Sequence, residues 1–98
     1  MLFLDNNVLW QINNVIVYPN PFDGNTTIKY MVNNYEKVTL RIIDISGFVI
    51  DVPINAWQMP GVYEVKFNPQ KFGLSQGTYL YYLTIGTKNK AGELHYIK

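Results

Sequence analysis

The chain has 98 residues, of which 48% are hydrophobic and 15% aromatic, and its net charge at neutral pH is +1. This length suits one domain with a core, and the balanced charge argues against a nucleic-acid groove or an anionic-membrane patch. Cysteine is absent, which excludes disulfides and thiolate chemistry. No apolar run approaches the length that spans a bilayer, so we expect no direct membrane insertion. Because the charge is balanced, we also expect no nucleic-acid partner.

The first fourteen residues, MLFLDNNVLWQINN, fit neither a strand nor a helix pattern. Asp5 interrupts the apolar stretch and no basic leader precedes it, so we do not expect a signal peptide. We expect residues 1–14 to be a linker or the tail of a preceding domain, or else an extra hairpin around the Asp-Asn-Asn turn at 5–7.

Short segments that alternate apolar and polar residues fill the rest of the chain, with turn residues between them. Such a series is typical of an all-β, immunoglobulin-like antiparallel β-sandwich. It predicts seven strands, at about 15–18, 26–32, 37–44, 48–54, 61–67, 77–86 and 92–98. We expect the core to contain Tyr30, Leu40, Ile42, Tyr63, Val65, Tyr79, Tyr81 and Leu83.

Three of these strands carry further expectations. The segment 77–86 is apolar on both faces and should lie in the middle of a sheet, and 92–98 should pair with it as a hairpin after a six-residue turn at 87–92. Pro53 marks 48–54 as an edge strand or one that breaks off. We expect one face of that strand to carry Phe48, Ile50, Val52 and Ile54.

The segment Val-Tyr-Pro-Asn-Pro-Phe at 17–22 places two prolines around a single asparagine. Proline has no backbone N–H to donate and is confined to strand starts, sheet edges and turns. We expect Pro19 and Pro21 to end the first strand, to protect its edge and to stiffen the chain where it enters the domain. Asn20 suits the bend between them, and Asp23-Gly24 suits the turn that follows.

The sequence offers few candidates for catalytic or metal-binding residues. His95 is the single histidine and lies in the last strand, so we expect an outward strand residue and not a catalytic base. Oxygen ligands occur in the turns at 5–7 and 23–25, but neither turn has an EF-hand spacing, and a zinc site lacks ligands. We therefore expect no catalytic residue, no cofactor and no metal.

The large aromatic side chains allow two interpretations of their role. Trp10, Trp57, Tyr18, Tyr35 and Tyr82 could form a flat platform that stacks on sugars, or they could fill the core and cover its ends. We favour the second interpretation, in which these side chains fill the core and cover its ends. Tyr79 follows Gly77 at the start of a strand, and we expect it to pack or to hydrogen-bond a neighbouring loop in the manner of a tyrosine corner.

Five motifs occur in a fixed order, at 17–22, 26–30, 38–47, 61–63 and 74–79, before the final Leu-His-Tyr-Ile-Lys. Their defining positions are Tyr18, Pro19, Asn20, Pro21, Phe22, Asp44, Gly47, Gly61, Tyr63, Gly77 and Tyr79. Over residues 15–98 this order resembles the C-terminal sorting domain of the type IX secretion system (the Por-type, or type A, sorting domain). One position departs from the family pattern, because Phe48 stands where a basic residue usually follows the Asp-x-x-Gly turn.

The resemblance implies a non-catalytic signal that directs a cargo protein, carried in front of it on the same chain, across the outer membrane. The implied partners are the secretion translocon and a sortase-like peptidase that removes the domain, and the implied location is the periplasm in transit and then the cell surface or the medium. The implied recognition residues are Leu94, Tyr96, Ile97 and Lys98. A carbohydrate-binding module of a secreted enzyme and a fibronectin-like spacer stay open as alternatives.

Overall fold

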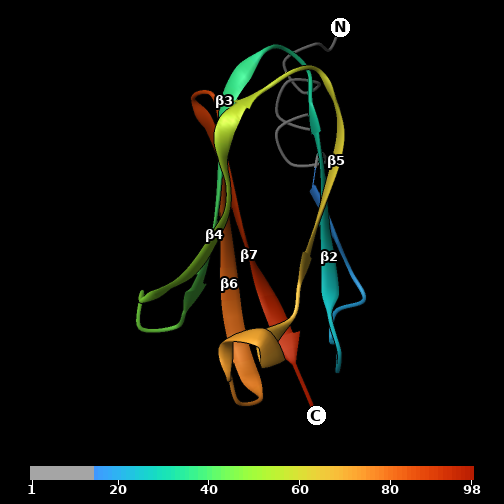
Figure 1. The fold of residues 1–98 in the computed structure, drawn as a ribbon, viewed down its shortest axis with the longest axis vertical. Helices are drawn as coiled ribbons and strands as arrows, with labels where there is room; N and C mark the ends of the chain where they lie inside the picture. The colour runs from blue at the N-terminus through green and yellow to red at the C-terminus, as the bar shows by residue number, and fades with distance from the viewer. Residues whose placement is uncertain (1–14) are drawn as a thin grey trace, which may run out of the picture.

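Two antiparallel sheets form the fold of residues 15–98, the part of the chain that the computed structural model describes (Figure 1). One sheet has the order β1-β2-β5 and the other the order β4-β3-β6-β7. The strands are β1 (Val15–Tyr18), β2 (Thr26–Val32), β3 (Glu36–Asp44), β4 (Val49–Gln58), β5 (Gly61–Phe67), β6 (Gly77–Ile85) and β7 (Lys88–Tyr96). A short 3-10 helix, η1 (Pro69–Phe72), connects β5 to β6. The predicted all-β sandwich of seven strands is confirmed.

No helix within residues 15–98 has the length and apolar character needed to cross a membrane. The expectations for residues 1–14, including the extra hairpin, lie outside the described residues.

The core lies between the two sheets and follows the period-two alternation of the strands. In β3, for example, Val38, Leu40 and Ile42 are buried while the residues between them are not. The predicted core residues Tyr30, Leu40, Ile42, Tyr79, Tyr81 and Leu83 are buried. Tyr63 and Val65 are only half-buried, because β5 is an edge strand with a neighbour on one side.

β4 lies at the edge of its sheet, as Pro53 predicted, but the strand continues through the proline to Gln58. The pairing with β3 shifts here, since Leu40 faces Ile54 while Ile42 faces Asp51, which leaves Val52 and Pro53 opposite Arg41. This two-against-one arrangement is a bulge, and bulges accommodate proline in edge strands. Because the bulge breaks the alternation, the predicted single apolar face is wrong. Val52 is exposed, and so is Phe48, which precedes the strand, whereas Ile50 and Ile54 are partly buried.

β6 lies between β3 and β7, and it forms the predicted hairpin with β7. The predicted six-residue turn is wrong: Ile85 pairs with Lys88, so only Gly86 and Thr87 connect the strands. The polar run that suggested a turn instead forms an edge strand, where lysines are common and discourage pairing with other chains. Gly92 lies within the strand, where a Cβ atom would come within 2.5 Å of the ring of Tyr81. The ring therefore requires glycine at this position.

Candidate functional site

The segment at 19–22, which follows β1, leaves its own sheet and lies along the edge of β7 in the other sheet. β1 ends at Tyr18, directly before Pro19, as predicted. Phe22 and Tyr96 form a parallel β-bridge, in which the N–H of Phe22 donates to the carbonyl of His95 (2.9 Å) and the N–H of Ile97 donates to the carbonyl of Phe22 (2.8 Å). We call this contact of residues 20–22 with residues 93–97 the clasp.

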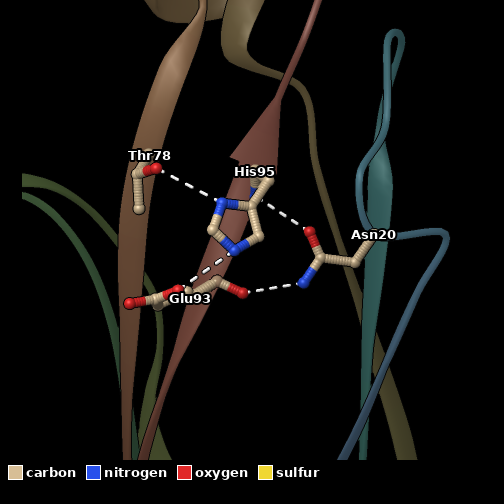
Figure 2. Close-up of polar contacts among 4 residues, drawn as sticks. All are labelled: Asn20, Thr78, Glu93 and His95. Carbon is tan, nitrogen blue, oxygen red and sulfur yellow. Dashed lines mark hydrogen bonds and ion pairs between the residues drawn. The ribbon is translucent and has the colours of Figure 1, made fainter.

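Asn20 binds the same edge through its side chain (Figure 2). Its Nδ2 donates to the carbonyl of Glu93 and its Oδ1 accepts from the N–H of His95, each at 2.8 Å. Neither flanking proline has an N–H to offer, and both follow cis peptide bonds. The partners of Asn20 lie more than 70 residues away in sequence, and no local pattern predicted this contact. One feature of the sequence did point to this contact. Asn20 is the single residue between the two prolines, and its side-chain amide can donate a hydrogen bond.

Phe22 anchors the clasp in the core. Its side chain is 3% exposed, its ring stacks on that of Tyr96 with centroids 5.5 Å apart, and it meets Phe67 edge-on at 6.5 Å. Phe67 in turn stacks on Phe72 of η1 at 5.9 Å. These rings close the end of the sandwich at which η1 and the C-terminus lie (Figure 1).

The four predicted recognition residues divide into two kinds. Leu94 and Tyr96 point into the core and are buried, so their side chains do not face a partner of the folded domain. Ile97 and Lys98 are exposed beyond the end of β7. The N–H of Lys98 donates to Oε1 of Gln76 at 3.3 Å, which ties the last residue to the loop before β6.

The Asp-x-x-Gly motif forms the turn between β3 and β4. Oδ1 of Asp44 accepts from the hydroxyl of Ser46 (2.6 Å), from the N–H of Ser46 (2.9 Å) and from the N–H of Phe48 (3.0 Å). These bonds, that of the Ser46 hydroxyl above all, hold the pKa of the Asp44 carboxyl below its usual value. Gly47 has φ +96°, which side chains disfavour. Phe48, which follows this turn, is 69% exposed.

The two Gly-x-Tyr motifs share one structural role. The hydroxyl of Tyr63 donates to the carbonyl of Met59, and that of Tyr79 donates to the carbonyl of Ser75, both at 2.6 Å. Each tyrosine thus satisfies a carbonyl four residues earlier, in the loop that leads into its own strand. The expected tyrosine corner at Tyr79 is confirmed, and Tyr63 repeats it at the start of β5.

Thr78, His95 and Glu93 form a row on the outer face of β6 and β7 (Figure 2). Nδ1 of His95 lies 3.2 Å from the hydroxyl of Thr78, and its Nε2 lies 3.0 Å from Oε1 of Glu93. Hydroxyl, imidazole and carboxylate are the groups of a catalytic triad, but a triad depends on a site that excludes water. Here the side chains of His95 and Glu93 are 41% and 61% exposed. The row therefore fits an exposed contact of the His95 side chain with those of Glu93 and Thr78.

The other candidates gather into no ligand site. Within residues 15–98, no three His, Asp or Glu side chains come together to hold a metal ion, and the turn at 23–25 is exposed. The turn at 5–7 and Trp10 lie outside the described residues.

Of the aromatic residues considered for a sugar platform, Tyr35 and Trp57 stack on each other at 5.3 Å, and both are exposed. Each ring covers one face of the other. Tyr18 lies on the other sheet, where its hydroxyl donates to Glu64 at 3.2 Å. Tyr82, on β6, shares a sheet with Trp57 but lies two strands away from it. Among the candidates within residues 15–98, the structure thus brings together one pair and no flat platform.

Comparison with known proteins identifies the chain. Residues 16–95 match the family described as the secretion system C-terminal sorting domain. Comparisons with curated proteins and with solved structures found no match. The matched range runs from β1 to His95 in β7 and includes Asn20, Phe22 and Glu93. The chain belongs to the family of secretion system C-terminal sorting domains.

Proposed function

We propose that this domain is a non-catalytic address signal that is read by protein partners of the type IX secretion system. The family to which it belongs consists of C-terminal sorting signals for type IX secretion, which lead to export across the outer membrane. The family match over residues 16–95 is the observation that carries the proposal. The cargo is the protein in front of the domain on the same chain, and it passes through the periplasm on its way to the cell surface or the medium.

The mechanism we propose is binding by a rigid scaffold. The clasp and the aromatic rings around Phe22 hold the end of β7 in one place, and from there the exposed side chains of Ile97 and Lys98 face the solvent. An outer-membrane translocon reads this end of the domain. A sortase-like peptidase then separates the domain from its cargo, which is joined to anionic lipopolysaccharide or released.

The test is delivery of a fluorescent cargo fused in front of the 98-residue chain, behind a signal peptide, in a host with this secretion system. The informative variant is Ile97→Ala combined with Lys98→Ala, because both side chains are exposed and the backbone bond from Ile97 to Phe22 stays intact. We expect the parent fusion at the surface and the double variant in the periplasm, both folded. As a matched control, Val62→Ala with Lys88→Ala removes an exposed apolar side chain and an exposed lysine at the far end of the sandwich and should leave delivery unchanged.

Retention of the folded parent fusion in the periplasm would contradict the proposed function. Normal delivery of the double variant would leave the function standing and would show that Ile97 and Lys98 are not the residues that are read.

A further inference from the structure

The side chain of Asn20 takes the place of a backbone peptide in a β-ladder. In a parallel ladder, one residue donates its N–H to a carbonyl and accepts from an N–H two residues further along the partner strand. Phe22 does this across Tyr96, donating to His95 and accepting from Ile97. The side-chain amide of Asn20 makes the same two bonds on either side of Leu94, two residues earlier on β7. It donates to the carbonyl of Glu93 and accepts from the N–H of His95 (Figure 2).

The backbone of Phe22 and the side chain of Asn20 together satisfy four consecutive polar groups on the outer edge of β7. These groups are the carbonyl of Glu93, the N–H and the carbonyl of His95, and the N–H of Ile97. Pro21, between the two, has no N–H that could compete for them. An edge with unsatisfied groups is a template for other chains, so the clasp also protects this end of β7.

We propose that Asn20 is a positioning residue, which holds residues 93–97 against residues 20–22 and thereby fixes where Ile97 and Lys98 are presented. The second half of this statement rests on the proposed sorting function, and the first half does not. The Asn20 side chain is exposed, so replacing it opens no cavity in the core. The contact between the side chains of His95 and Glu93 uses other atoms of these two residues.

Aspartate is the most informative replacement because its shape is nearly that of asparagine. The carboxylate can still accept from the N–H of His95, but it has no proton to donate and would place an oxygen against the carbonyl of Glu93. Asn20→Ala removes both bonds. Asn34→Asp is the matched control, because it makes the same change of charge at an exposed site beyond the far end of β2.

The first measurement is amide hydrogen exchange, followed by NMR on the purified 98-residue chain. We expect the amides of His95 and Ile97 to exchange about tenfold faster in Asn20→Ala, since the net worth of such bonds corresponds to roughly that factor. In Asn20→Asp the amide of Ile97 should also exchange faster, while the Asn34→Asp control should match the parent. Unchanged rates at both amides in Asn20→Ala and in Asn20→Asp would overturn the positioning role.

The second measurement is delivery of the same variants as cargo fusions. We expect Asn20→Ala and Asn20→Asp to reduce surface delivery several-fold. Ile42→Val, a core change away from the clasp, should reduce delivery less than an Asn20 variant that loses the same amount of stability. An equal reduction by Ile42→Val would overturn the proposal in favour of a general stability effect. Faster exchange with full delivery would overturn the presentation of Ile97 and Lys98 while the sorting function stands. A folded parent fusion that is not delivered refutes the sorting function, and the exchange rates still decide whether Asn20 holds β7.

Discussion

Replacing Phe22 by alanine should destabilise the domain more than replacing any other residue of its motif. The ring is 3% exposed and contacts the rings of Tyr96 and Phe67. Truncation of a buried phenylalanine costs about 3–5 kcal/mol of unfolding free energy, of which each aromatic pair contributes about 0.5–1.5 kcal/mol. A domain of this size has a total stability of about 5–15 kcal/mol, so the variant should be close to unfolding.

Urea unfolding followed by tryptophan fluorescence measures this loss as a shift of the midpoint at constant slope. Phe22→Leu keeps an apolar side chain and should lose about 1–2 kcal/mol, because part of the cavity stays filled. The control is Phe48→Ala, whose ring is 69% exposed and whose loss should change stability by no more than about 0.5 kcal/mol. If Phe22→Ala loses under about 1 kcal/mol, the ring does not anchor the clasp.

Four further substitutions test other parts of the structure. Gly92→Ala places a Cβ atom 2.5 Å from a facing tyrosine ring and should cost about 1–3 kcal/mol in urea unfolding; no loss would contradict the observed pairing. The lowered pKa of Asp44 gives stability that is present at neutral pH and lost as the pH falls from near 3.8 through the folded value, so thermal melts of Asp44→Asn should depend less on pH in this range. His95→Ala removes an exposed side-chain contact with Glu93 worth about 0–1 kcal/mol and should leave folding and delivery intact, whereas lost delivery would assign His95 a role in sorting. Tyr96→Phe removes a buried hydroxyl without a hydrogen-bond partner among the described residues and should leave stability equal or raise it by about 1 kcal/mol; a clear loss would show that the hydroxyl is bonded.

Local patterns were sufficient to predict the number of strands and the place of β4 at a sheet edge, but not the bounds of β4 and β7. Alternation in β3 places Val38, Leu40 and Ile42 in the core because the side-chain period of a strand is two. Pro53 marks an edge strand because a central strand needs its missing N–H. Tyr79 reaches the carbonyl of Ser75 only four residues away, so its role was also predictable.

Contacts between distant residues set the features that the sequence did not predict. Gly92 signals a turn when only its neighbours in sequence are considered, and its place within β7 is explained by a ring on β6. The exposure of Phe48 depends on the β3–β4 turn that precedes the bulge. Asn20 finds its partners across the sandwich, on Glu93 and His95, so the pairing exists only once both sheets have formed. The motif that identified the family was visible, but its structural role was not.

The most direct test of the sorting function is the location of the cargo in matched strains with and without the secretion translocon. Cells that express the cargo fused to the 98-residue chain are treated with an external protease that cannot cross the outer membrane. We predict that the cargo is cleaved or released in the strain with the translocon and protected inside the periplasm in the strain without it. Equal protection in both strains, with the domain folded, would contradict the assignment of this chain as a sorting signal.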